Sequence, residues 1–261
     1  MRSLSTAATG MLAQQLNVEV ISNNIANMNT TSYKRQRAEF QDLLYDNLRR
    51  SGSQSSDTGT IVPAGVQVGI GVKTAAVYRI NEQGNLVSTS NNYDLAIKGK
   101  GYFRVQLPSG EDAYTRAGSF QLSAEGQLVT ADGYVVSPGI TIPQDAVDVS
   151  INPNGEVQVK LDGQVAPTTV GQIEIASFFN EAGLEAVGDN LLKETPASGS
   201  ATISVPGDPG FGVIQQGFLE TSNVNAVQEI TALITAQRAY EMNSRVIKTS
   251  DEMLQTTSTL R

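Results

Sequence analysis

The first part of the chain carries apolar side chains at seven-residue intervals. One row holds Leu4, Met11, Val18 and Ile25. The row three positions further on holds Ala7, Ile21 and Met28, with the polar Gln14 as its single interruption. Residues seven apart share one face of an α-helix, so the pattern predicts an amphipathic helix of about 25 residues. We expect Ser3 or Ser5 to cap its start. We expect it to end near 23–29, where asparagines compete for backbone hydrogen bonds.

The last part of the chain repeats this pattern. One row holds Leu233, Tyr240, Ile247 and Leu254, and the adjacent row holds Ala232, Ala239, Val246 and Met253. Residues 224–258 contain neither Gly nor Pro, and Ser222 or Asn223 is the expected N-cap. Two long amphipathic stripes at opposite ends favour a coiled-coil-like helical pair. The alternative is an ordinary pair of core helices that pack on the middle of the chain.

The middle of the chain reads as short strands separated by tight turns. The turn pairs are Gln83-Gly84, Glu125-Gly126, Asp132-Gly133, Asn154-Gly155 and Asp162-Gly163. The predicted strands are Val66–Arg79, Leu86–Thr89, Leu95–Ile97, Tyr102–Leu107, Gly118–Leu122, Gln127–Val136, Val147–Ile151, Glu156–Leu161 and Ile173–Phe179. Segment 180–212 is rich in Pro and Gly and is interpreted as a long return connection that can hydrogen-bond along the sheet. An antiparallel sandwich or barrel is expected.

Composition supports a discontinuous α+β architecture. All nine prolines lie between Pro63 and Pro209, and only Gly10 and Gly217 lie outside 51–216. That stretch also holds 17 acidic and 8 basic residues. We therefore predict a terminal helical domain made of 1–44 and 217–261 around a β-rich body at 66–216, with a possible subdomain at about 144–200. Residues 45–65 are polar and Ser/Gly-rich, a composition typical of a flexible linker.

The residue types that are missing restrict the chemistry. The chain has no His, Cys or Trp, which excludes imidazole or thiolate metal ligands and a Ser-His-Asp triad. The net charge of −8 disfavours nucleic acid, and no apolar run is long enough for membrane insertion. Residues 65–71, GVQVGIG, lack the Lys-Ser/Thr of a phosphate loop and indicate close backbone packing. Lys34, Arg35 and Arg37 are expected to pair with Glu39 and Asp42. We expect no enzyme activity, no metal and no cofactor.

Several stretches resemble the bacterial flagellar rod and hook proteins. They are ISNNIANMNTTSY at 21–33, LAIKGKGYF at 95–103, YTRAGSF at 114–120, GQLVTADGYVVSPGITIP at 126–143, and the closing helix at 219–254. The closing helix is most similar to the distal-rod members of that family. The signature positions are Asn23, Asn24, Ile25, Ala26, Asn27, Ser32, Tyr33, Gln237, Arg238, Tyr240 and Asn243.

The resemblance implies a structural role. Members of the family form the axial drive shaft of the flagellum, with the terminal helices lining the export channel and the β domains facing outward. It implies a helical homo-oligomer in the basal body that spans the periplasm, with the proximal rod, the hook, the P- and L-rings and the flagellar export apparatus as partners. Export through that apparatus agrees with the absence of a cleavable signal peptide at the start of this sequence.

The apolar rows supply the expected assembly interface, because neighbouring copies can cover side chains that one helical pair leaves exposed. The interface residues are Leu4, Met11, Val18, Ile21, Ile25, Leu233, Tyr240, Ile247 and Leu254. We also expect the chain ends to be disordered or aggregation-prone in the monomer and to order on assembly.

The resemblance also changes the interpretation of residues 45–65. In distal-rod proteins an extra stretch follows the first helix and braces neighbouring subunits, whereas hook proteins commonly lack it. The brace would use Arg49, Arg50, Ile61 and Val62. Three alternatives remain. They are a hook or proximal-rod protein of the same family, a β-domain adhesin with coiled-coil ends, and an enzyme that uses carboxylates.

Overall fold

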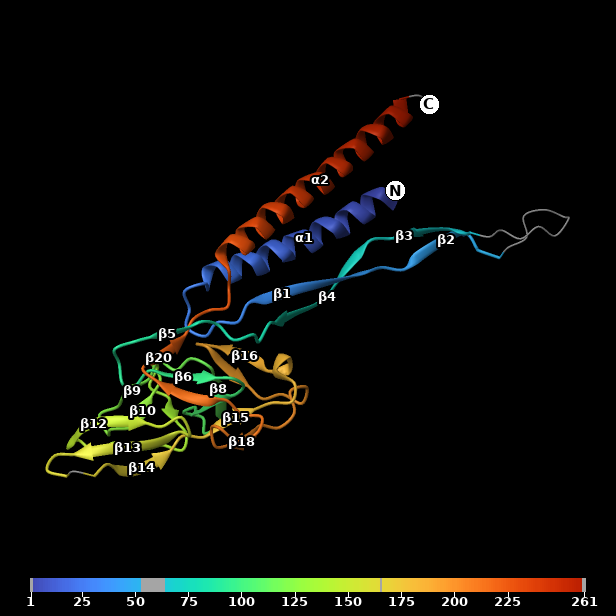
Figure 1. The fold of residues 1–261 in the computed structure, drawn as a ribbon. Coiled ribbons are helices and arrows are strands. Elements are labelled where there is room, and N and C mark those ends of the chain that lie inside the picture. The colour runs from blue at the N-terminus through green and yellow to red at the C-terminus, as the bar shows by residue number, and fades with distance from the viewer. Residues whose placement is uncertain (1, 53–63, 165, 260–261) are drawn as a thin grey trace. The chain divides into compact units, whose positions relative to one another are not determined.

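A computed structural model describes residues 2–52, 64–164 and 166–259 (Figure 1). Its contacts divide the chain into two compact units. The helical unit contains the described residues of Met1–Ala26, Gln36–Tyr78 and Asn225–Arg261, and the β unit contains Asn27–Arg35 and Arg79–Val224. These units differ from the predicted domains in where residues 27–35, 66–78 and 217–224 fall. The predicted α+β class is confirmed, with helices at both ends and an antiparallel β-rich body between them.

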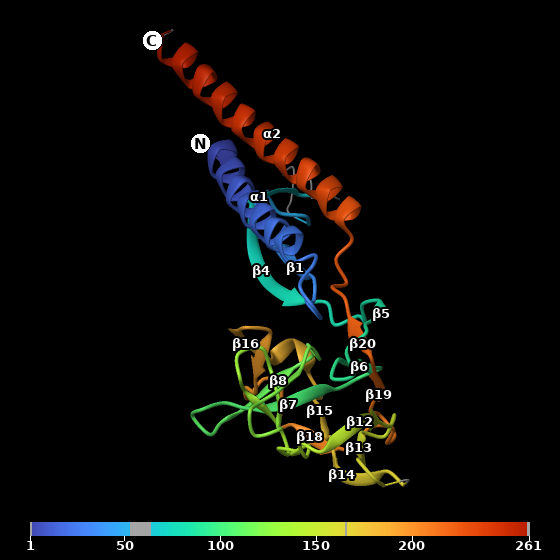
Figure 2. The same ribbon diagram turned by 90° about the vertical axis from the view of Figure 1, so that its left-hand side faces the viewer.

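The helical unit is built on helix α1 (Arg2–Ala26) and helix α2 (Ala226–Thr259), which lie side by side in both views (Figures 1 and 2). The predicted length and end of α1 are confirmed. Both predicted N-caps are wrong. Helix α1 already begins at Arg2, so Ser3 and Ser5 lie inside its first turn. Helix α2 is capped by Asn225, whose Oδ1 accepts hydrogen bonds from the backbone N–H groups of Val227 and Gln228 at 3.1 and 3.3 Å.

Four strands accompany α1 in the helical unit. They are β1 (Gln36–Asp42), β2 (Tyr45–Arg49), β3 (Val66–Gly69) and β4 (Val72–Arg79). Strand β1 pairs with β4, and β2 pairs with β3 in antiparallel register. Val66–Arg79, predicted as one strand, is thus two strands that part at Gly71. A Cβ at Gly71 would lie 2.3 Å from Thr9 Oγ1 on α1, which confirms the close backbone packing expected of GVQVGIG.

The β unit contains sixteen of the described strands and one short 3₁₀ helix, η1 (Glu181–Gly183). The strands are β5 (Leu86–Ser88), β6 (Leu95–Lys98), β7 (Tyr102–Gln106), β8 (Asp112–Thr115), β9 (Gln121–Leu122), β10 (Leu128–Val129), β11 (Val135–Val136), β12 (Ala146–Ile151), β13 (Glu156–Leu161), β14 (Thr168–Gln172), β15 (Ile175–Ser177), β16 (Glu185–Gly188), β17 (Leu191–Lys193), β18 (Thr202–Ser204), β19 (Val213–Gln216) and β20 (Phe218–Glu220).

The largest sheet of the β unit has nine strands in the order β16-β17-β8-β7-β11-β10-β9, with β15 joining β7 to β18. Strands β12, β13 and β14 form a second sheet, and the pairs β19–β6 and β20–β5 complete the unit. These pairings are antiparallel. The apolar core runs between these elements and includes Phe103 and Phe120, whose rings meet edge to face at 5.1 Å.

The β unit differs from the sequence prediction in several details. Gln127–Val136, predicted as one strand, forms the two paired strands β10 and β11, and the prediction lacks β8, β14, β19 and β20. Segment 180–212 is hydrogen-bonded along the sheet through β17 and β18, and it also carries η1 and β16. The glycines of four predicted turns have positive φ, namely Gly126, Gly133, Gly155 and Gly163. Gly84 is needed for another reason, because a Cβ there would lie 2.0 Å from the carbonyl oxygen of Thr221.

Candidate assembly interface

Helices α1 and α2 meet along a row of small and polar residues. Ser3 Oγ lies 3.4 Å from Ser250 Oγ, and a Cβ at Gly10 would lie 2.9 Å from Asn243 Nδ2. Each step of seven residues forward along α1 is thus matched by a step of seven backward along α2, so the helices are antiparallel. The next step of seven residues leads to Asn17, which lines the same groove as Ala236. The step after that leads to a buried pair of residues where α1 ends and α2 begins.

That buried pair consists of Asn24 and Glu229, which are 1% and 5% exposed. Asn24 Nδ2 donates a hydrogen bond to Glu229 Oε2 at 3.1 Å and another to the carbonyl oxygen of Gln36 at 2.8 Å. The backbone N–H of Gln36 donates in return to Asn24 Oδ1 at 2.8 Å. The end of α1, the start of α2 and the start of β1 are therefore held by one amide side chain.

The predicted apolar rows flank this small and polar row. Val18 and Tyr240 line one groove together, on the side where the rows of Leu4 and Leu254 run. Of the predicted interface residues, only Ile21 is buried. Half-buried are Leu4, Met11, Val18, Ile25, Leu233 and Ile247, whereas Tyr240 and Leu254 are 43% and 42% exposed. One chain thus leaves much of these rows exposed to solvent.

The opposite flank is lined by smaller side chains. A groove of about 600 Å³ opens there between Gln14 and Asn17 on α1 and the small residues Ala232, Ala236 and Ala239 on α2. The apolar side chains of Val227, Ile230, Ile234, Met242, Val246 and Met253 on α2 are all more than two-fifths exposed. Helix α2 therefore carries far more apolar surface than α1 covers.

The family-signature residues fall into different environments. Asn24 and Asn243 lie in the helix seam, and Ile25 lies beside it. Asn23, Ala26, Gln237, Arg238 and Tyr240 are exposed on the two helices. In the β unit, Asn27 Oδ1 accepts a hydrogen bond from Thr30 Oγ1, Ser32 is buried, and Tyr33 is half-buried. The backbone N–H of Tyr33 donates to the carbonyl oxygen of Thr30.

The predicted brace is partly described. Its first residues form β2, and an ion pair joins Asp46 to Arg2 of α1. Arg49 and Arg50 are exposed at the end of β2, whereas Ile61 and Val62 lie outside the described residues. The paired strands β2 and β3 and their flanks expose apolar side chains that the sequence analysis did not single out. These are Leu44, Tyr45, Leu48, Val66, Val68 and Ile70.

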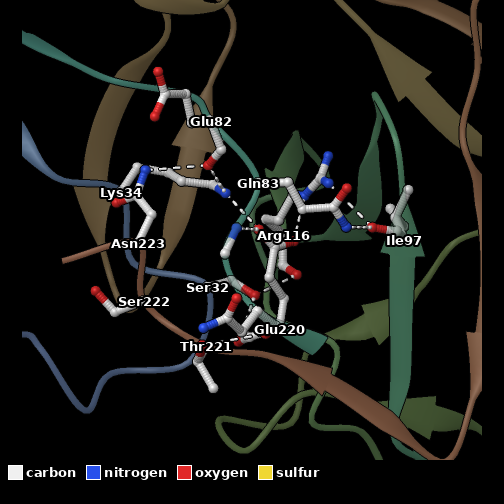
Figure 3. A network of polar contacts seen from close by, with 12 residues as sticks. Ser32, Lys34, Glu82, Gln83, Ile97, Arg116, Glu220, Thr221, Ser222 and Asn223 are labelled. Carbon is white, nitrogen blue, oxygen red and sulfur yellow. Dashed lines mark hydrogen bonds and ion pairs between the residues drawn. The ribbon is translucent and has the colours of Figure 1, made fainter. Parts of the chain in front are cut away.

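The β unit contains a buried charge network that sequence reasoning missed (Figure 3). Glu220, only 1% exposed, accepts from Lys34 Nζ at 2.5 Å and from Arg116 Nε at 2.8 Å. The backbone N–H of Gly84 donates to Glu220 Oε1 at 2.9 Å. Lys34, expected to pair with Glu39 and Asp42, is thus bound to an acid 186 residues away. The carboxylate can accept about four hydrogen bonds, and donors from three different segments occupy three of these positions.

Further hydrogen bonds join this network to nearby segments of the same chain. Arg116 donates to the carbonyl oxygens of Ile97, Gly99 and Gly101 at 3.1, 2.5 and 2.7 Å. Ser32 Oγ donates to the carbonyl oxygen of Arg116 at 2.9 Å. The network therefore joins the segment at 32–34, which begins the β unit, to the segment at 220, which ends it. We call Lys34, Arg116 and Glu220 the charge cluster.

A similar anchor lies next to the charge cluster. Asn223 Oδ1 accepts from the backbone N–H of Arg35 at 2.7 Å. Asn223 Nδ2 donates to the carbonyl oxygens of Ile80 and Glu82 at 2.9 and 3.1 Å. Asn223, proposed above as a helix cap, therefore binds three backbone groups of the β unit instead.

The surroundings shift the pKa values of the cluster. Burial alone would raise the pKa of Glu220, but the charges of Arg116 and Lys34 outweigh it and hold that pKa below its usual value. Burial lowers the pKa of Lys34 more strongly than the Glu220 carboxylate raises it. Nearby, burial followed by the charge of Glu181 raises the pKa of Tyr102. The arrangement is a tightly bonded structural cluster.

Metal binding and membrane crossing each require a recognisable arrangement of residues. Among residues 2–52, 64–164 and 166–259, no three acidic side chains gather as metal ligands would. Neither described helix combines the length and apolar character that a membrane crossing requires.

Models of flagellar protein families match the beginning, the middle and the end of the chain. Residues 4–34 match the model described as "Flagella basal body rod protein". Residues 96–159 match "Flagellar hook protein FlgE/F/G D1 domain", and residues 215–260 match "Flagellar basal body rod FlgEFG protein C-terminal".

Several relatives that match over nearly their full length are flagellar basal-body rod proteins named FlgG. The flagellar basal-body rod protein FlgG of Caulobacter vibrioides is 67% identical over 261 residues, which cover all of both chains. The FlgG protein of Agrobacterium fabrum is 54% identical over 97% of each chain. That of Buchnera aphidicola from Schizaphis graminum is 48% identical over 99% of each chain.

Proposed function

Because the chain belongs to the family of bacterial flagellar basal-body rod proteins, and is thus a structural subunit of the rod, we propose that its copies stack into the rigid helical tube of the distal rod. In this proposal the tube transmits motor torque to the hook and encloses the export channel. The subunit is a structural component with no catalytic step. The alternatives of an adhesin or a carboxylate enzyme have no comparable support.

The observation that carries the proposal is the uncovered apolar surface of the helical unit. Tyr240, Val246 and Leu254 remain 42–44% exposed although α1 lies beside α2. Burying one large apolar side chain is worth about 1.5–3 kcal/mol, so neighbouring copies that cover these rows would gain substantial free energy. A contact that does not close on itself generates a helical polymer.

The location and partners follow from the same assembly. We propose that the subunit spans the periplasm within the basal body and leaves the cell through the flagellar export apparatus. The proximal rod and the hook would meet the two ends of the tube, and the P- and L-ring proteins would surround it. These assignments rest on the family and on the outward position that the family gives to its β domains.

The first test introduces one carboxylate into the apolar row. Leu254→Glu would place a charge where a neighbouring copy is expected to bury a side chain, and we expect polymerisation to be lost. Gln255→Glu is the matched control, because Gln255 is exposed and lies in the row of Glu241 and Lys248. Electron microscopy of the purified full chain measures both. Filaments of L254E as abundant as those of Q255E would contradict the proposal.

We further propose that strands β2 and β3 and the segment between them brace neighbouring subunits. The exposed apolar side chains of this region, such as Leu44 at 82% and Leu48 at 59%, support a packing role. Deleting residues 46–64 is expected to leave a polymer that bends more readily. Filament curvature in electron micrographs measures this, and straight rods from the deleted chain would overturn the brace assignment.

A further inference from the structure

The seam between α1 and α2 consists of residues that contribute little apolar surface. On α1 these residues are Ser3, Gly10, Asn17 and Asn24, and on α2 they are Ser250, Asn243, Ala236 and Glu229. A helical pair built for stability alone would place its largest apolar side chains here. Most of those side chains instead lie on the flanks, half-buried or exposed, with Val20 and Ile21 of α1 as the buried exceptions. The seam therefore has a purpose other than maximal burial.

The apolar rows cannot by themselves fix one alignment of the helices. They repeat every seven residues, so sliding α2 along α1 by seven positions again sets apolar side chains against apolar side chains. Helix α2 has 34 residues and α1 has 25, so the longer helix leaves room for such a slip. Residues 251–259 of α2 are all exposed and would enter the seam after a slip in one direction.

The seam residues distinguish the observed alignment from the slipped ones. After a slip of seven, Asn24 would face Ala236, which cannot accept its hydrogen bond, and Glu229 would lie beyond the end of α1 at Ala26. A slip in the other direction would set Glu229 against Asn17. It would also free Asn24 from every α2 partner, because position 222 precedes the helix. Either slip breaks the buried Asn24–Glu229 hydrogen bond.

The position of Gly10 adds a steric condition. A Cβ at this residue would lie 2.9 Å from Asn243 Nδ2, so the amide of Asn243 would have to move if α1 carried a side chain here. The three seam positions before Asn24 include one glycine, which lies opposite Asn243 in one alignment only. Asn24 is also bonded in both directions to the backbone of Gln36, so it cannot follow a sliding helix.

We propose that this row is a register lock. It selects one antiparallel alignment of α1 with α2 of the same chain, with the Asn24–Glu229 pair as its decisive contact, and leaves the apolar rows free to meet other copies. A buried polar residue in a helical seam is well suited to this role, because it penalises every alignment that leaves it unpaired. The lock concerns the single folded chain and holds whether or not the copies polymerise.

The absence of cysteine from the sequence makes the lock directly testable. Ser3→Cys with Ser250→Cys reports the observed alignment, because the two hydroxyl oxygens are 3.4 Å apart. Ser3→Cys with Thr257→Cys reports a slip of seven residues and leaves the seam of α2 unchanged. Both pairs are made in the full-length chain, oxidised at high dilution, and scored for disulfides within one chain by mass spectrometry.

We expect the first pair to cross-link about tenfold or more efficiently than the second. In the background of Asn24→Leu with Glu229→Leu, the slipped pair should approach the yield of the native pair. Asn24→Ala with Glu229→Ala removes the pair without added bulk and should act in the same direction. Glu229→Gln still accepts from Asn24 and should retain the native preference.

Equal cross-linking of the two reporters in the natural seam would overturn the lock, and so would an unchanged preference in both pair-deleting variants. Circular dichroism of each variant confirms that the helical content needed for the comparison is present. Electron microscopy of the same samples separates the two proposals. A chain that keeps its alignment and forms no filaments would count against the rod function and leave the lock intact.

Discussion

The two units of this molecule differ in where they keep their large apolar side chains. Every large side chain less than 2% exposed in the described residues lies in the β unit. The buried apolar side chains of α1 and α2 are mostly small, namely Ala7, Ala13 and Ala236, with Val20 and Ile21 as the larger ones. The β unit therefore has a core of its own, whereas the helical unit keeps much of its apolar surface outside.

The buried polar groups of the two units differ in how many parts of the chain they join. The charge cluster of the β unit satisfies one buried carboxylate from three segments, so its loss affects the unit as a whole. The Asn24–Glu229 pair of the helical unit satisfies two side chains at one end of a long seam. The β unit is thus held together by buried contacts of its own, whereas the helical unit leaves apolar surface that, in the proposed assembly, other copies would cover.

The largest effect is expected from breaking α2. Leu233→Pro removes a backbone hydrogen bond inside the first third of α2 and costs about 3 kcal/mol or more locally. We expect polymerisation to be abolished while the β unit still unfolds in a cooperative transition of its own. Electron microscopy measures polymerisation. Urea denaturation followed by tyrosine circular dichroism measures the unfolding of the β unit. Leu233→Ala, which keeps the helix, is the control, and joint loss of both transitions would refute the independence of the units.

The next effect is expected inside the β unit. Glu220→Ala leaves Lys34 and Arg116 buried without their carboxylate, which typically costs about 3–5 kcal/mol. Urea denaturation of the full chain measures the loss in the free energy of unfolding. The matched control is Glu174→Ala, whose carboxylate pairs with Arg104 at 3.1 Å but is 40% exposed. That exposed pair should contribute about 1 kcal/mol or less. Similar losses for both variants would show that burial of the cluster is unimportant.

A smaller effect is expected from acid. Because the pKa of Glu220 is lowered in the folded chain, its contribution to stability is fully present above its ordinary value of 4.5. That contribution is lost as the pH falls from there through the folded pKa. The stability of Glu220→Gln should therefore change less over this range than that of the natural chain. Denaturation curves between neutral pH and pH 3 test this, and parallel pH profiles would contradict it.

The sequence predicted the helices well because their signals are local and repeated. The bounds of α1 followed from its apolar period and its asparagines, and α2 from a long stretch without Gly or Pro. The caps were wrong by a few residues, because several Ser and Asn side chains near each end can all accept a backbone hydrogen bond. Only Asn225 stands where the backbone of α2 turns.

The helix seam was not predicted, because an analysis of apolar periodicity passes over a row made of Ser, Gly, Asn and Ala. A seven-residue spacing of small and polar residues beside the apolar rows was the available signal. Gly10, the single glycine of the first helix, belonged to it. In the structure this row supplies the contacts between the helices at Ser3–Ser250, Gly10–Asn243 and Asn24–Glu229.

The charge cluster had no signal in the local pattern. Lys34 and Glu220 are far apart in the sequence, and acids closer to Lys34, such as Glu39, gave a simpler pairing. Strands β16, β17 and β18 were missed for a related reason. They are three or four residues long, and their pairing partners rather than their own alternation define them.

The position of Glu220 near the end of the chain has a consequence for the order of events in synthesis. A ribosome delivers Lys34 and Arg116 long before their shared carboxylate emerges, and strands β19 and β20 arrive equally late to close on β6 and β5. The nascent β unit therefore lacks both its central counter-ion and its final strands until most of the polypeptide has been made. The β unit can therefore be completed only after residue 220 has been synthesised.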